Sequence, residues 1–240
     1  MAERDWREQL HLARERPARE GPDHARLEGP NLWPVDEGWR QALIAYLDAT
    51  AALGERIIDA LTGELGLPPG SIPRGGPDGH VVMKLIGYHP QAAAGIARPG
   101  VAAHVDFSLL TLTLQDCPGL EIRTPAGSWT LVEPRPDAVW VHPGELLELA
   151  SGGRWPATPH RVVNRSLERT RVSIPLFLNP PLEAVVPGAD RVFAAPDGEH
   201  VHRVLAPGAP PRPLHFGEAE WRRKGLDGWC HACAPATPAP

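Results

Sequence analysis

Two histidines and one aspartate stand at a spacing that could hold a metal ion. One residue separates His104 from Asp106, and His160 comes later in the chain. Residues two apart in a strand point to the same face, so His104 and Asp106 can reach one ion, and a later strand can bring His160 opposite them. Two imidazoles and one carboxylate on one face of an ion are typical of non-haem iron(II) oxygenases. The alternative is that these are ordinary loop and strand residues, the usual reading of an isolated H-x-D.

A second polar pair, Arg171 and Ser173, follows eleven residues after His160 and also shares one face of a predicted strand. A guanidinium and a hydroxyl directed into a barrel cost desolvation unless they meet an anion. A dicarboxylic acid would supply one through a charge-assisted contact. The alternative is a surface arginine on an edge strand, although the flanking run VSIPLF is largely apolar and typical of an interior strand.

From the HxD motif onward the chain resembles the isopenicillin N synthase-like family of iron- and 2-oxoglutarate-dependent oxygenases. The matching motifs are HxD followed by SLLTLTLQD, the hairpin GLEIR…W, PGELL, GGR…TPHRV, and RVS leading to FLNP. Upstream, GPNLWP and the predicted helix after it are also similar to the family. The resemblance covers roughly residues 28 to 182.

This resemblance implies a mainly β fold, a double-stranded β-helix or jelly roll with a long N-terminal helix packed on it. It implies Fe(II) as the cofactor, held by His104, Asp106 and His160. It further implies 2-oxoglutarate as the co-substrate, anchored at its far carboxylate by Arg171 and Ser173, with dioxygen and a small molecule as the other reactants. The expected outcome is hydroxylation, desaturation or ring closure, in which the metal carries the hard chemistry and the protein orients the substrate.

Two departures from the family pattern bear on the pocket. Family members usually carry a further N-terminal region before the segment resembling residues 5–14. We expect its absence to leave the pocket more open, or to leave apolar surface that residues 1–34 or a second subunit of a homodimer would cover. The strand that usually ends in tyrosine before proline here reads Gly-Tyr88-His89-Pro. Tyr88 or His89 is therefore expected beside the co-substrate, and His89 could instead face solvent.

The substrate pocket is predicted from residues next to the ligand and anchor strands, namely Phe107, Leu178 and Asn179. The proline- and alanine-rich composition is associated with specialised metabolism, but it does not identify a substrate. Two other functions remain open. An oxidase or cyclase of the same family that does not use 2-oxoglutarate can keep the R-x-S motif. A cupin-like binding protein would retain only a relict site, and the complete motif set argues against it.

The elements that must position these residues are short. Pro and Gly, with counts of 29 and 24 in 240 residues, favour many turns. We expect a short helix at 5–14 within an N-terminal segment 1–34, then an oxygenase domain at 35–228 and a flexible tail at 229–240. The domain begins with a helix at 36–66 that Asp36 caps, and a second helix is expected at 217–224. The jelly-roll core spans about 81–182, with strands predicted at 81–88, 109–114, 119–123, 128–132, 138–142, 145–149, 160–164 and 171–178.

The composition and the remaining motifs argue against several classes of protein: nucleic-acid-binding, membrane, secreted and zinc-binding proteins. A net charge of −5 gives no reason to expect nucleic acid or an anionic membrane as a partner, and no apolar run reaches about 18 residues. The charged N-terminus lacks the apolar core of a signal peptide, and the three cysteines fit a reducing cytoplasm.

Cys230 and Cys233 form a lone C-x-x-C motif that lacks further zinc ligands. The histidines without partners at ligand spacing are read as structural or exposed: His142, His200, His202 and His215.

Overall fold

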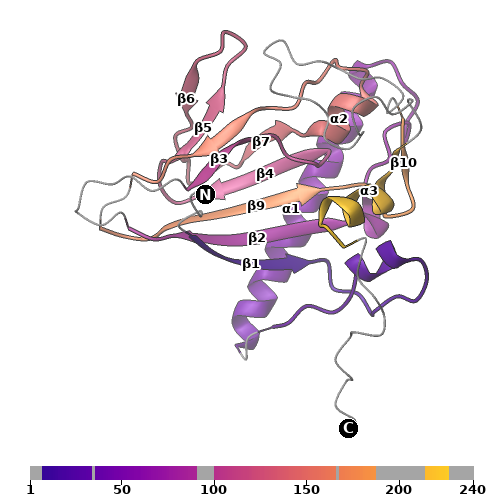
Figure 1. Cartoon of the computed structure of the whole chain (residues 1–240), viewed down its shortest axis with the longest axis horizontal. Coiled ribbons are helices and arrows are strands. Elements are labelled where there is room, and N and C mark those ends of the chain that lie inside the picture. Colours follow the sequence, from indigo (N-terminus) through magenta and orange to yellow (C-terminus); the bar gives the residue numbers. More distant parts are fainter. Residues whose placement is uncertain (1–6, 34–35, 91–99, 166–167, 188–213, 227–240) are drawn as a thin grey trace.

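The computed structural model describes residues 7–33, 36–90, 100–165, 168–187 and 214–226. Within these ranges the strands form a five-stranded sheet, a four-stranded sheet and a small two-stranded sheet, all antiparallel (Figure 1). Cys230, Cys233, His200, His202 and the expected tail lie outside the described residues. None of the described helices is both long enough and apolar enough to cross a membrane.

The five-stranded sheet carries most of the polar residues of interest. Its order is β1-β2-β9-β4-β7, so segments far apart in the sequence lie side by side. In this sheet Tyr88 pairs with Arg171, and Gln115 pairs with Ser173. The strands are β1 (Arg7–Ala13), β2 (Val81–Tyr88), β4 (Leu110–Gln115), β7 (Trp140–Pro143) and β9 (Arg171–Leu178).

The two faces of this sheet differ because side chains alternate along each strand. In β4, Leu110 and Leu112 enter the hydrophobic core, whereas Thr111 and Thr113 line a pocket on the other face. In β9 the same alternation places Leu176 in the core. The sequence LLTLTLQ thus encodes one apolar and one polar face.

The four-stranded sheet closes the pocket from the other side. Its order is β3-β8-β5-β6, and the first two strands bring His104 opposite His160. Side chains of both sheets line one pocket, which is the arrangement expected of the predicted jelly roll. The strands are β3 (Val101–His104), β5 (Leu120–Arg123), β6 (Trp129–Leu131) and β8 (His160–Val162).

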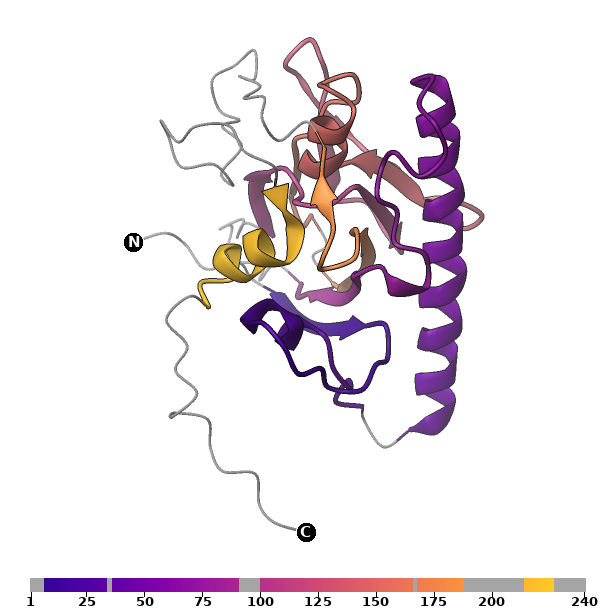
Figure 2. The ribbon, with the colours of Figure 1, turned by 90° about the vertical axis from the view of Figure 1, so that its right-hand side faces the viewer.

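A long helix, α1 (Glu37–Glu64), covers the apolar face of the five-stranded sheet (Figure 2). The Asp36 side chain caps it by accepting a hydrogen bond from the Trp39 amide at 2.9 Å, as predicted. Gly54 lets the helix approach closely, because a Cβ there would lie 3.0 Å from a Leu178 methyl and 3.1 Å from a Leu112 methyl. The predicted helix at 36–66 is confirmed.

The remaining elements surround the pocket and the chain ends. Helix α3 (Phe216–Arg223) confirms the prediction at 217–224, and it lies on the side of the strands away from α1 (Figure 2). The others are η1 (Asp23–Leu27), η2 (Gly76–Asp78), α2 (Glu145–Ala150), β10 (Val185–Val186) and β11 (Leu214–His215).

Two predicted elements are wrong in type. Residues 7–13 form the edge strand β1 instead of a helix, because they pair with β2 along their whole length and direct Leu10 and Leu12 toward the core. Residues 145–150 form helix α2 instead of a strand. Leu146, Leu147 and Leu149 are all buried there, and such a short apolar run fits a strand and a buried helix equally well.

Candidate metal centre and co-substrate pocket

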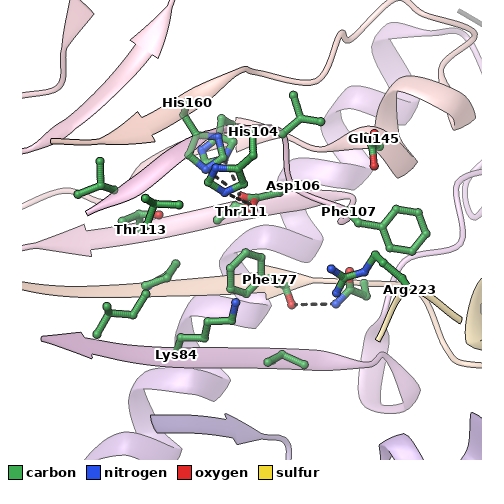
Figure 3. A pocket seen from close by; sticks show the side chains of 18 of the residues that line it. Lys84, His104, Asp106, Phe107, Thr111, Thr113, Glu145, His160, Phe177 and Arg223 are labelled. Atoms are coloured by element: carbon green, nitrogen blue, oxygen red, sulfur yellow. Dashed lines mark hydrogen bonds and ion pairs between the residues drawn. The ribbon is translucent and has the colours of Figure 1, made fainter. Parts of the chain in front are cut away.

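The three predicted ligands converge in the structure. His104 ends β3, Asp106 follows it by two residues, and His160 opens β8 directly opposite His104. Each offers one ligand atom, and the three atoms lie within 4.8 Å of one another. Figure 3 shows the two imidazoles and the carboxylate directed toward one point above β4. The predicted spacing therefore brings these side chains to a single centre.

Backbone contacts fix both imidazoles in the form that a metal requires. His104 Nδ1 lies 2.9 Å from the Ala102 carbonyl, and His160 Nδ1 lies 3.0 Å from the Thr158 carbonyl. A carbonyl can only accept, so each Nδ1 donates its proton, and in the neutral ring Nε2 is left with the lone pair that a metal would bind. The Nε2 atoms are also the ones that approach Asp106, at 3.5 and 3.7 Å. Such anchoring of the remote ring nitrogen is common in metal-binding histidines.

Electrostatics in the centre also fit a divalent cation. Burial opposes ionisation of Asp106, but its interactions with His160, His104 and His142 hold its pKa well below the usual value. Burial lowers the pKa of His160 to about 4, so that this ring is neutral at neutral pH. A neutral imidazole beside a buried carboxylate leaves a negative charge that a bound metal ion can balance.

A third histidine, His142, forms a hydrogen bond with the carboxylate of Asp106. His142, on β7, is 2% exposed, and its Nε2 donates to Asp106 Oδ2 at 3.0 Å. Thr111, which pairs with His142 across β4 and β7, donates its hydroxyl to the same oxygen at 2.6 Å. The sequence spacing of His142 does not reveal this contact, because it depends on the register of β4 and β7. These two bonds fix the orientation of Asp106.

The predicted anchor arginine is the largest fully buried side chain among the described residues. Arg171 is 0% exposed, and it donates through Nη2 to Gln115 Oε1 at 2.6 Å and through Nε to the Cys117 carbonyl at 3.1 Å. Its Nη1 is buried and makes no hydrogen bond within the described part of the chain. Gly119 is needed beside it, since a Cβ there would lie 2.8 Å from Arg171 Nε.

Arg171 therefore has the features of an anion anchor. Both of its hydrogen bonds go to neutral acceptors, so they do not neutralise its charge. Ser173 is 5% exposed on the same face of β9, and both residues line the pocket that contains the triad. A carboxylate placed here would balance the guanidinium and occupy the free Nη1.

The structure separates the two candidates next to Pro90. Tyr88 is 2% exposed, lines the pocket, and has its ring 4.9 Å from the guanidinium carbon of Arg171. His89 does not line the pocket, and its Nε2 lies 3.9 Å from a carboxylate oxygen of Glu8. Of the two residues expected beside the co-substrate, Tyr88 therefore lies at the pocket, and His89 lies outside it.

The predicted substrate residues divide in the same way. Phe107 and Asn179 line the pocket, whereas Leu178 is 0% exposed in the core against α1. The assignment of Leu178 to the pocket is wrong, because it lies an odd number of residues from Arg171 and so occupies the opposite face of β9. The pocket has a volume of about 1330 Å³. Helix α3 contributes its far wall, which the sequence analysis did not assign to the site.

Comparison with known proteins agrees with this geometry. The family described as the 2OG-Fe(II) oxygenase superfamily matches residues 77–180. The chain is 32% identical over 225 residues to leucoanthocyanidin dioxygenase 1 of Oryza sativa subsp. japonica, covering 84% of this chain and 57% of that protein. It is 32% identical over 172 residues to homoarginine-6-hydroxylase 2-ODD-C23.1 of Arabidopsis thaliana, covering 68% and 51%. The chain thus spans about half the length of these relatives.

Solved structures show the same fold. A full-length Neurospora crassa protein in complex with alpha-KG aligns with a TM-score of 0.69 at 23% sequence identity, covering 92% of this chain and 66% of that one. JOX2 in complex with 2OG, Fe and JA aligns with a TM-score of 0.67 at 21% identity, covering 92% and 60%. These similarities confirm the predicted double-stranded β-helix. The family match and the sequence relatives show that the chain belongs to the 2OG-Fe(II) oxygenase superfamily, a family of non-haem Fe(II)- and 2-oxoglutarate-dependent dioxygenases.

Proposed function

We propose that this chain is an Fe(II)- and 2-oxoglutarate-dependent oxygenase that hydroxylates, desaturates or cyclises a small molecule. The observation that carries the proposal is that a three-ligand metal centre and a buried, unneutralised guanidinium line the same pocket. His104, Asp106 and His160 would hold Fe(II). Arg171 and Ser173, with Tyr88 beside them, would hold the far carboxylate of 2-oxoglutarate.

The protein's own residues would prepare this reaction by binding the metal and by orienting the side chains that hold it. The backbone carbonyls of Ala102 and Thr158 keep the two Nε2 atoms free to bind, and Thr111 and His142 hold the carboxylate. When bound, Fe(II) supplies the reduction of dioxygen coupled to decarboxylation of 2-oxoglutarate to succinate. The walls of the two sheets exclude bulk water from the buried anchor, which strengthens its contact with the carboxylate.

The choice of a small-molecule substrate rests on the pocket and on the relatives. A volume of about 1330 Å³ exceeds what 2-oxoglutarate alone would fill, so space remains for a second molecule. The similar proteins are named for a leucoanthocyanidin and for homoarginine, which are both small metabolites. We therefore propose a role in specialised metabolism.

The test is Fe(II)-dependent release of succinate by the purified full chain. Candidate substrates, taken from the names of the similar proteins, are leucoanthocyanidins, homoarginine and related amino acids, thymine, and auxins. Mass spectrometry then separates hydroxylation, seen as a gain of oxygen, from desaturation or ring closure, seen as a loss of hydrogen. We expect succinate and product in matched amounts. Product without succinate would identify an oxidase that does not use 2-oxoglutarate, and iron binding without any oxidation would contradict catalysis.

A further inference from the structure

Lys84 is a cationic side chain of the pocket that belongs neither to the metal ligands nor to the Arg171 anchor. Lys84 lies on β2, whose alternation sends Val81 and Met83 into the core and directs Lys84 and Tyr88 into the pocket. Its Nζ lies 4.8 Å from the centre of the Phe177 ring. Figure 3 shows the side chain extending from β2 toward Phe177 and the metal centre above it. The ammonium is thus presented to whatever occupies the pocket beside the metal.

The charge of Lys84 is not balanced by an ion pair with any described carboxylate. The two cations at the end of α3 differ, because Glu220 pairs with Arg223 at 2.6 Å and with Lys224 at 3.3 Å. Burial lowers the pKa of Lys84, and the charge of Asp106 opposes that change. A bound metal would neutralise Asp106, so the ammonium would still need an anion.

The strand register separates Lys84 from the co-substrate anchor. Tyr88 pairs with Arg171, and Lys84 lies four residues further along β2. At about 3.3 Å per residue this separation is about 13 Å along the strand. Val82 pairs with Phe177 on the far side of Lys84, so Lys84 lies toward the Phe177 end of the pocket and away from Arg171.

The walls around this end are aromatic. Phe177 contacts Lys84, and the Phe107 ring packs 6.0 Å from Phe216 at the start of α3. Arg223 lies over the other pocket ring, 5.6 Å from the centre of Phe107. A ligand here would place one anionic group at the ammonium and an apolar or aromatic body against the rings.

We propose that Lys84 binds a carboxylate of the primary substrate, so that the enzyme acts on small monocarboxylic acids with an apolar or aromatic body. This inference rests on the proposed function, because it assigns the second occupant of the same pocket. A single ammonium matches a single negative charge, which favours a carboxylate over a phosphate dianion. Lys84 is therefore a specificity residue, distinct from the Arg171 anchor.

The experiment measures binding of paired probes that differ only in charge. The protein is loaded with Fe(II) and 2-oxoglutarate without oxygen and titrated calorimetrically with arylalkanoic acids of graded chain length, 3-phenylpropionate among them, and with the primary amide of each. We expect at least one acid to bind more tightly than its amide by about 10- to 100-fold, the usual effect of a hydrogen bond to a charged group. Lys84→Gln should abolish that preference, and Lys84→Arg should restore part of it.

Lys224→Gln is the matched control, since it removes the same charge from a lysine that is already paired with Glu220. It should reduce the acid preference much less than Lys84→Gln does. The affinity for 2-oxoglutarate, titrated separately, should be unchanged in Lys84→Gln. If no acid binds better than its amide, or if the preference survives Lys84→Gln, the substrate class is wrong. The same conclusion follows if Lys84→Gln weakens 2-oxoglutarate binding, because Lys84 would then serve the co-substrate.

These outcomes are distinguishable from failure of the proposed function. Succinate release by the parent chain tests the oxygenase activity and does not depend on the charge of the probe. A chain that consumes 2-oxoglutarate but binds acids and amides equally would retain its function and lose only the substrate assignment.

Discussion

The two ends of the pocket hold their cations in different ways. At one end, Arg171 is 0% exposed and held by two hydrogen bonds to Gln115 and Cys117, with Gly119 leaving room for it. At the other end, Lys84 Nζ lies over the Phe177 ring, 4.8 Å from its centre. The first cation is fixed in position, whereas the second can adjust.

This difference fits the division of labour that we propose. A co-substrate that is the same in every turnover favours a rigid, preorganised anchor, because little ordering then accompanies binding. A planar guanidinium suits that task, whereas an ammonium on a four-carbon stem acts as a movable point charge. Substrate choice can thus change at the Lys84 and α3 end while the Arg171 anchor is kept.

The largest effect should come from Arg171, at the rigid end. Arg171→Gln removes a charge-assisted contact in a dry pocket, which costs on the order of 2–5 kcal/mol. The 2-oxoglutarate dissociation constant should therefore rise by roughly 30- to several-thousand-fold, at about 1.4 kcal/mol per decade. Iron content is the control and should not change, because Arg171 is not a ligand. If Arg171→Gln leaves the affinity for 2-oxoglutarate unaltered, Arg171 is not the co-substrate anchor, and the proposed difference between the two ends of the pocket is wrong.

The next effect concerns the metal. His160→Ala removes one of the three ligand atoms that lie within 4.8 Å of one another. Loss of a residue that only supports a ligand typically lowers metal affinity about 10- to 100-fold, so loss of a ligand should cost about 100-fold or more. Equilibrium iron titration measures it, with His89→Ala as the control from outside the pocket. Retention of one tightly bound Fe(II) per chain by His160→Ala would refute the ligand assignment.

A smaller effect should distinguish His142 as a positioning residue. His142→Leu removes the 3.0 Å hydrogen bond to Asp106 and leaves the three ligands in place. We expect iron affinity to fall by about tenfold, at the low end of the range for such supporting contacts, because Thr111 still holds the same oxygen. His142→Gln, which keeps a donor, should recover part of it. Equal iron affinities of the parent and the Leu variant would leave His142 with a packing role alone.

The smallest predicted effect belongs to Ser173. Ser173→Ala removes a neutral hydroxyl next to the anchor, and such a contact is worth about 0.5–1.5 kcal/mol. The affinity for 2-oxoglutarate should fall by roughly 2- to 12-fold, in the same direction as for Arg171→Gln. Calorimetric titration of the two variants side by side checks the order. A larger effect of Ser173→Ala would place the carboxylate on the hydroxyl instead of the guanidinium.

Strand alternation predicted the anchor pair correctly, because Arg171 and Ser173 lie two residues apart on β9 and so share one face. For the other pair the alternation argument does not hold, because β3 ends at His104 and Asp106 lies beyond it, although both side chains still reach one centre. The same rule could have excluded Leu178, which has the wrong parity relative to Arg171. The family motifs supplied the connection between the two pairs, one of which lies at the end of β3 and the other on β9.

The features that were missed depend on tertiary pairing. The contact of His142 with Asp106 follows from the register of β4 and β7, in which Thr111 stands opposite His142. Residues 7–13 are strand because β2 offers them a free edge, which local propensity does not reveal. The unneutralised charge of Lys84 becomes visible only when Glu220 is seen to pair with Arg223 and Lys224.

The central claim is that the triad and Arg171 form one composite site for Fe(II) and 2-oxoglutarate. Titrating the chain with 2-oxoglutarate without oxygen, with and without Fe(II), tests this claim most directly. We predict one 2-oxoglutarate per chain, bound much more tightly when Fe(II) is present, and by linkage an equal tightening of Fe(II) by 2-oxoglutarate. Binding of 2-oxoglutarate that is absent, or that is indifferent to Fe(II), would contradict the account.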